Sequence, residues 1–134
     1  MTNEQVAWAA GFFDGEGYVS IASRMDHSQY IKVGINHVDP RPLQKFQQLF
    51  GGKLNYSSKV RGNRKPRWSW VLSCNQAKEF LLLIKPYLIN KDIVTEIAIE
   101  FLSTISKTKL KLPQEITDIR LDCAKRLKLI NSET

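Results

Sequence analysis

Residues 8–17 read WAAGFFDGEG, and this stretch decides how the rest of the chain is interpreted. It is an apolar run with two glycines that ends in two acids and leads into the alternating run of residues 18–23. The apolar run predicts a helix over about residues 4–15, and the alternation predicts a strand. Glu16 is therefore expected at the helix end, on a turn fixed by Gly15 and Gly17, with its carboxylate exposed.

Small residues recur on one face of this predicted helix, at Ala7, Gly11 and Gly15. Glycine inside a helix costs about 1 kcal/mol relative to alanine, so two glycines need a packing reason. We expect a second helix to approach closely along this face. The large side chains are expected in the subunit's own core: Trp8, Phe12 and Phe13. The pattern also fits an ordinary helix end with glycine caps that happens to carry acids.

The composition is that of a soluble globular protein, with 134 residues, 43% hydrophobic and 25% charged, which fits one domain. No apolar run reaches the roughly 18 residues of a membrane span, and the first residues lack the basic start of a signal peptide. We therefore expect no membrane partner and a cytoplasmic or organellar location. Cys74 and Cys123 have no cysteine or histidine nearby, so zinc binding is not expected and both are predicted to be small buried residues.

Positive charge is concentrated in the middle of the chain. The net charge is +7, and the 39 positions between Asp39 and Glu79 hold nine Lys and Arg residues and no acid. Such a segment is typical of a protein that binds a polyanion, and we expect nucleic acid. A solvated basic face with no partner is the alternative.

Residues 18–24 and 29–38 are predicted to form a hairpin with one core face and one polar face. The core residues of its second strand are Ile31, Val33 and Ile35. A helix follows, capped by Asp39 and ending at Gly51 and Gly52. Its apolar stripe, which should cover the back of the sheet, consists of Leu43, Phe46, Leu49 and Phe50.

A second hairpin is predicted from residues 53–60 and 67–73. Alternation places one set of side chains together on the polar face: Lys53, Asn55, Ser57, Lys59, Arg67, Ser69, Val71 and Ser73. The opposite face holds Leu54, Tyr56, Trp68, Trp70 and Leu72. The tryptophans are expected in the core because they share a face with Leu72, although a base-stacking platform is the alternative.

Three helices are predicted to complete the chain. The first covers residues 75–85, stops at Pro86 and should bury Ala77, Phe80, Leu81 and Ile84. The second covers about residues 90–103, with Ile93, Ile97, Phe101 and the neighbouring Ile105 in register. The last covers about residues 113–129 and carries Ile116, Ile119, Leu121 and Leu127. The order is helix, hairpin, helix, hairpin, then helices.

Three segments resemble the LAGLIDADG homing endonucleases. Residues 9–17, AAGFFDGEG, match the family motif, with glutamate in place of its last aspartate. Residues 82–91, LLIKPYLINK, resemble the family's helix-proline-helix junction. Residues 46–54, FQQLFGGKL, are similar to the passage that precedes its second hairpin. Because only one copy of the motif is present, the resemblance is to the single-motif, homodimeric type.

The resemblance implies an α+β fold with an αββαββα core. A curved four-stranded antiparallel sheet would form a DNA-binding saddle, with helices on its convex side. The core would cover about residues 4–105 and a C-terminal helix about residues 113–130, within one domain of residues 1–134. The small face, Ala7, Gly11 and Gly15, would be the dimer seam, and a dimer implies a pseudo-palindromic target.

The resemblance also implies where the chemistry lies. Glu16 and the Gly15 carbonyl would bind Mg²⁺, and Mn²⁺ or Ca²⁺ could occupy the same site. Lys91 would stabilise charge near the scissile phosphate or orient water, and it is otherwise an exposed helix lysine. His37 and Arg41 occupy the region where the family places polar residues that position water, although a histidine at a strand end is more often structural. Asp14 is expected to support the turn.

The polar face of the sheet would enter the major groove of double-stranded DNA. Its residues are Ser20, Ala22, Arg24, Tyr30, Lys32, Gly34, Lys53, Asn55, Ser57, Lys59, Arg67, Ser69 and Val71. The hairpin tip would contact phosphates through Arg61, Arg64 and Lys65. We therefore expect a homodimeric, Mg²⁺-dependent DNA endonuclease that makes a staggered double-strand cut. The alternatives are an intron RNA maturase and a DNA-binding module whose nuclease activity has decayed.

Overall fold

The computed structural model describes residues 1–23, 29–57, 66–104 and 114–132. The first half of the chain runs α1 (Asn3–Glu16), β1 (Gly17–Ser23), β2 (Gln29–His37), α2 (Pro40–Phe50), β3 (Lys53–Ser57) and β4 (Arg67–Leu72). The second half runs α3 (Cys74–Ile84), the 3-10 helix η1 (Lys85–Tyr87), α4 (Asp92–Leu102) and α5 (Gln114–Ser132). The predicted αββαββα core is confirmed.

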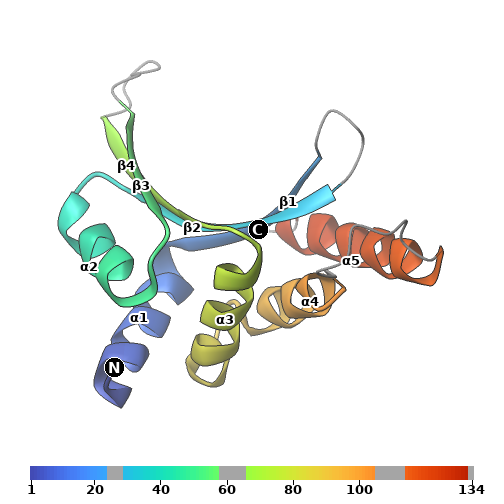
Figure 1. Ribbon diagram of the computed structural model, residues 1–134, viewed down its shortest axis with the longest axis horizontal. Helices are drawn as coiled ribbons and strands as arrows, with labels where there is room; N and C mark the ends of the chain where they lie inside the picture. The colour runs from blue at the N-terminus through green and yellow to red at the C-terminus, as the bar shows by residue number, and fades with distance from the viewer. Residues whose placement is uncertain (24–28, 58–65, 105–113, 133–134) are drawn as a thin grey trace.

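The four strands form one antiparallel sheet in the order β1-β2-β4-β3. Figure 1 shows this sheet as a curved saddle, with the helices packed on its convex side and no described helix on its concave side. The strand pairs β1-β2 and β3-β4 extend toward opposite ends of the saddle. The two faces of the sheet therefore have separate roles, one in the core and one open.

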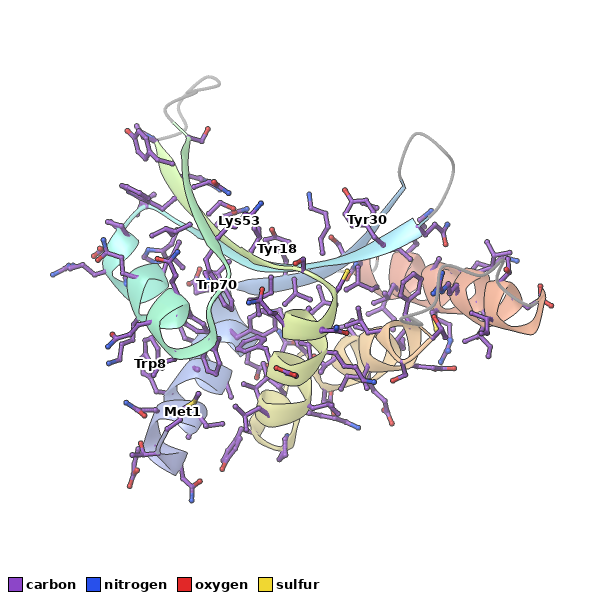
Figure 2. All side chains as sticks on the ribbon, in the orientation of Figure 1. Met1, Trp8, Tyr18, Tyr30, Lys53 and Trp70 are labelled. Atoms are coloured by element: carbon purple, nitrogen blue, oxygen red, sulfur yellow. The ribbon has the colours of Figure 1, made fainter. Side chains whose placement is uncertain are left out.

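The strand registers confirm the predicted faces. Lys53 pairs with Val71, Asn55 with Ser69 and Ser57 with Arg67, so these six residues share one face. On the first hairpin Ser20 pairs with Lys32 and Ala22 with Tyr30. Figure 2 shows Tyr30 and Lys53 on the concave side and Trp70 on the opposite side. The buried set on the convex side includes Ile31, Val33, Ile35, Trp70 and Leu72.

Aromatic rings form the centre of the core beneath the sheet. The ring centroid of Phe46 lies 4.9 Å from that of Trp70, and Phe80 lies 5.3 Å from Trp70 and 5.2 Å from Phe13. The Trp70 indole N–H donates to the Gly51 carbonyl at 2.8 Å, which satisfies a donor that burial would otherwise leave unpaired. Gly51 has φ 77°, a backbone conformation that favours glycine, at the turn from α2 into β3.

Two predicted core residues lie at the surface. Trp8 is 41% exposed, although its ring packs against Phe12 and Phe46. Cys74 is exposed because it is the first residue of α3, where it has φ 39°, whereas Cys123 is buried as predicted. No helix of the described residues is long and apolar enough to cross a membrane.

The buried faces of the last two helices match the prediction in part, since Ile97, Phe101 and Leu127 are buried as predicted. Ile93 is 58% exposed in the first turn of α4, and that helix buries Val94, Ile97, Ala98, Phe101 and Leu102. On α5, Ile119 and Leu121 are exposed, because the face that packs against the rest of the protein contains Cys123, Ala124 and Leu127.

On β3, Tyr56 is 54% exposed beyond the edge of the core, where it packs against Trp68. Several predicted residues lie outside the described ranges: Arg24, Lys59, Arg61, Arg64, Lys65 and Ile105.

Candidate active site and nucleic-acid interface

The end of α1 delivers Glu16 to the beginning of β1. Glu16 is the last residue of the helix and is exposed, as predicted. The next residue, Gly17, packs on the Phe13 ring so closely that a Cβ there would lie 2.3 Å from a ring carbon. The helix can therefore join the strand directly only because residue 17 has no side chain. Among the described residues, none donates a hydrogen bond to the Glu16 carboxylate.

Asp14 joins α1 to the segment that precedes α4. Its carboxylate accepts hydrogen bonds from the backbone N–H groups of Ile89 at 3.0 Å, Asn90 at 3.0 Å and Lys91 at 2.7 Å. In the other direction, the Lys91 ammonium donates to the Asp14 carbonyl oxygen at 2.7 Å. We call this reciprocal contact the Asp14–Lys91 clasp. The Asp14 carboxylate thus binds a segment 75 residues further along the chain rather than the adjacent turn that it was expected to support, and alternation and spacing could not reveal this contact.

The pKa values of both partners in the clasp are lowered, for different reasons. Burial alone would raise the pKa of Asp14, but the three backbone N–H groups and the Lys91 charge outweigh it and lower the pKa. Burial lowers the pKa of Lys91, and the negative charges of Asp14 and Glu16 oppose that shift. The negative charge of Glu16 therefore acts on Lys91, together with that of Asp14.

His37 and Arg41 lie at the connection from β2 to α2. The backbone N–H of Asp39 donates to His37 Nδ1 at 3.0 Å, and the Asp39 carboxylate caps α2 and pairs with the Arg41 guanidinium at 2.6 Å. The hydrogen bond from Arg41 holds the pKa of Asp39 at about 2. No hydrogen bond or ion pair of the described residues joins His37 or Arg41 to Glu16 or Lys91, so the structure does not bring all four candidates together.

Tyr18 is a concave-face residue absent from the predicted set. It pairs with Gly34 across β1 and β2 and shares the face of Ser20. Figure 2 shows its side chain over the middle of the saddle, and its hydroxyl lies within hydrogen-bonding reach of Ser69 on β4. The sequence does indicate this position, because Tyr18 belongs to the same alternation as Ser20 and Ala22.

The described concave face is basic and polar. Lys32, Lys53 and Arg67 are exposed on it, together with Asn55 and Ser57. None of the described residues of β1, β2, β3 or β4 is acidic. Since cations and hydrogen-bonding groups cluster here and the helices occupy the opposite face, this surface fits a polyanion in charge.

The small face of α1 is open in the single chain. Ala7, Gly11 and Gly15 are exposed, and a Cβ added at either glycine would meet no atom within 4 Å. No contact within the described chain accounts for the two glycines, so the packing reason must come from a neighbouring molecule or from tolerance of the cost.

Side chains that could bind a metal ion are few in the described part of the chain. The described residues hold no cluster of three His, Cys, Asp or Glu side chains that could bind a metal ion. At the end of α1 the donors are the Glu16 carboxylate and the Gly15 carbonyl, both oxygen ligands of the kind that Mg²⁺ and Ca²⁺ prefer. These donors fit a divalent cation in type but are too few in one copy.

Comparison with protein families shows to which family the chain belongs. The profile of the LAGLIDADG-like domain matches residues 3–85. The chain belongs to the LAGLIDADG family. The LAGLIDADG match covers α1 through α3, which includes both hairpins of the saddle. No curated protein matches the sequence.

Solved structures confirm the LAGLIDADG fold over most of the chain. The archaeal intron-encoded homing endonuclease I-Vdi141I complexed with DNA superposes with a TM-score of 0.76 at 13% identity, covering 94% of this chain and 83% of that one. The homing endonuclease I-TnaI gives 0.62 at 20% identity, covering 96% of both chains. I-SmaMI bound to an uncleaved DNA target gives 0.66 at 19% identity, but this chain covers only 44% of it.

Proposed function

We propose that this LAGLIDADG protein is a Mg²⁺-dependent, site-specific endonuclease that acts as a homodimer on double-stranded DNA and makes a staggered cut. The observation that carries the proposal is the position of Glu16. Its exposed carboxylate stands at the junction of α1 with an uncovered basic sheet and within the electrostatic influence of Lys91. An acid with no hydrogen-bond donor among the described residues, beside a basic surface, is suited to hold a cation against a phosphate.

DNA recognition would use the concave face. Two-stranded ribbons fit the major groove, where Arg and Lys suit guanine acceptors and Asn suits adenine. Lys32, Lys53 and Arg67 would supply cations, and Asn55 an amide, from three strands of the saddle. Strand curvature would let the sheet follow the groove. The basic charge would provide affinity for any sequence, and the polar side chains would select the target.

Phosphodiester hydrolysis needs charge neutralised on the phosphate and an activated water, and a bound Mg²⁺ supplies both. Glu16 and the Gly15 carbonyl would hold it. Lys91 would stabilise negative charge on the phosphate oxygens or orient a water through its ammonium group. His37 and Arg41 would act at a greater distance, by shaping the β2 to α2 connection and positioning water.

The dimer completes the site. One chain brings a single carboxylate to the end of α1, whereas two chains that meet along Ala7, Gly11 and Gly15 would bring two. The coverage of I-SmaMI supports this arrangement, because that DNA-bound chain is more than twice as long as the part this chain matches. A symmetric dimer would require a target of approximate two-fold symmetry.

The experiment that tests the proposal is selection of cleaved molecules from a library of partly palindromic duplexes, with purified protein in Mg²⁺ and, in parallel, in EDTA. We expect one target family, cut on both strands at staggered positions in Mg²⁺ only. Duplex binding without cleavage would support a decayed DNA-binding module. Stimulated splicing of an intron RNA with no DNA cleavage would support a maturase. Cleavage in EDTA would contradict the metal requirement.

A further inference from the structure

The Asp14–Lys91 clasp connects the end of α1 to the start of α4 through bonds that run in both directions. Three backbone N–H groups converge on one carboxylate, and the Lys91 ammonium returns to the carbonyl of the same residue. The Asn90 side-chain amide adds a longer bond, 3.4 Å, to that carbonyl. Backbone and side-chain hydrogen bonds therefore both hold the end of α1 to the segment that precedes α4.

The clasp is not an ordinary helix cap. The amides that Asp14 binds belong to Ile89, Asn90 and Lys91, all of which precede the first residue of α4. Inside the helix, the Ile93 N–H is satisfied locally by the Asp92 carboxylate at 2.9 Å. Asp14 thus binds amides of the segment that ends at Lys91, whereas the Ile93 amide inside α4 is bound by Asp92.

The location of the clasp determines what it can control. Asp14 lies two positions before Glu16 on α1, so any group fixed to Asp14 keeps a constant relation to Glu16. Lys91 is fixed there twice, by its backbone N–H and by its ammonium, each at 2.7 Å. A lysine normally spreads its ammonium over many rotamers, and the bond to the Asp14 carbonyl removes most of that freedom.

We infer that Asp14 is a positioning residue that sets the Lys91 ammonium against Glu16 for phosphodiester cleavage. The inference rests on the proposed function. Asp14 contacts no substrate and acts through Lys91. Because the clasp is built on α1, the same helix that carries the small face would place both Glu16 and Lys91, so that assembly of two chains along α1 would align both groups at once.

The test uses Asp14→Asn, which keeps the side-chain shape but removes the charge and one of the two acceptor oxygens. Its matched control is Asp92→Asn, which makes the same change in an acid that also accepts a backbone N–H close to Lys91 but lies outside the clasp. The two changes are made alone and with Lys91→Met. Single-turnover cleavage of the selected target at saturating protein and binding of the duplex without divalent cation are measured for each.

We expect Asp14→Asn to slow cleavage by roughly 10²-fold, as misplacement of a reacting group by about 1 Å does, with DNA affinity unchanged. Asp92→Asn should cleave at the wild-type rate. In the Lys91→Met background, Asp14→Asn should cost nothing further, since two residues that act through one group are not additive. An equal loss from Asp14→Asn with and without Lys91, or no loss in either background, would overturn the inference.

A second readout does not depend on cleavage. Hydrogen exchange at the Lys91 amide should accelerate in Asp14→Asn and remain at the wild-type rate in Asp92→Asn, and equal protection in all three proteins would overturn the clasp. If the wild-type protein cuts no DNA, the proposed function fails while this measurement still decides the clasp. If Asp14→Asn does not fold, Asp14→Glu replaces it, and its cleavage defect should likewise disappear in the Lys91→Met background.

Discussion

The side chain of Tyr18 lies over Gly34 on the concave face of the sheet. A Cβ on Gly34 would stand 2.7 Å from the Tyr18 hydroxyl oxygen and 2.4 Å from the Trp70 carbonyl oxygen. The missing side chain therefore permits two things at once: the close approach of β2 to the β4 backbone, and the placement of an aromatic ring across the middle of the concave surface.

Substitution of this glycine should destabilise the fold. Gly34→Ala would force the Trp70 carbonyl, a backbone atom, to shift, and we expect a loss of about 1–3 kcal/mol in the free energy of unfolding, as overpacking costs. Urea denaturation measures it. The matched change Gly11→Ala meets open space and should leave stability equal or raise it by up to about 1 kcal/mol. Equal losses at both positions would contradict the packing described for Gly34.

The small face of α1 should accept a large side chain in the folded monomer but not in the proposed dimer. Gly11→Leu adds a side chain where no atom lies within 4 Å, so the thermal unfolding temperature should be retained. Sedimentation should show loss of the dimer, because helices cannot approach closely across a leucine at this position. Gln48→Leu, on the exposed surface of α2, is the control and should remain dimeric. A Gly11→Leu dimer of wild-type affinity would exclude this face as the seam.

Concave-face cations should contribute to affinity and to its salt dependence. Lys53→Ala and Arg67→Ala should each weaken duplex binding, and each lost phosphate contact should flatten the log-log salt slope by about 0.9. Binding isotherms at several salt concentrations measure both quantities. Lys45→Ala, on the exposed surface of α2 beneath the sheet, should change neither. If Lys45→Ala has the larger effect, DNA binds elsewhere.

The Asp39–Arg41 pair should be visible in an acid titration. Its carboxyl pKa is lowered from 3.8 to about 2, so the stability it contributes is present above pH 3.8 and is lost as the pH falls toward 2. Carboxyl ¹³C NMR should report the low pKa directly, and Arg41→Ala should move it back toward 3.8. The difference in unfolding free energy between the wild type and Arg41→Ala should shrink over the same interval. An unchanged Asp39 titration in Arg41→Ala would contradict the pairing.

Period-two alternation was sufficient to predict the two faces of the sheet, whereas the saddle shape was implied by the family resemblance. It assigned Lys53 and Asn55 to one face and Trp70 and Leu72 to the other, because in a strand each residue has only two directions available. Tyr18 was omitted although the same alternation includes it. Helix faces were harder to predict, since α5 has apolar residues on several sides and only its packing against the rest of the protein selects Cys123 and Leu127 rather than Ile119.

Only part of the candidate site could be predicted from the local sequence. The position of Glu16 at a helix end follows from the local sequence, as does the capping of α2 by Asp39. The clasp does not, because Asp14 and Lys91 meet only after the sheet and three helices have folded between them. The exposure of Trp8 was missed for a related reason, because it depends on the packing of Trp8 against Phe46 of α2, which a local sequence pattern does not reveal.

The account depends most on Glu16, where this chain has glutamate in place of the more common aspartate. The most direct test compares wild type and Glu16→Gln on the selected DNA target, measuring duplex binding without divalent cation and double-strand cleavage in Mg²⁺. The account predicts that Glu16→Gln binds the target with wild-type affinity and cleaves neither strand. Cleavage by Glu16→Gln at the wild-type rate would contradict it.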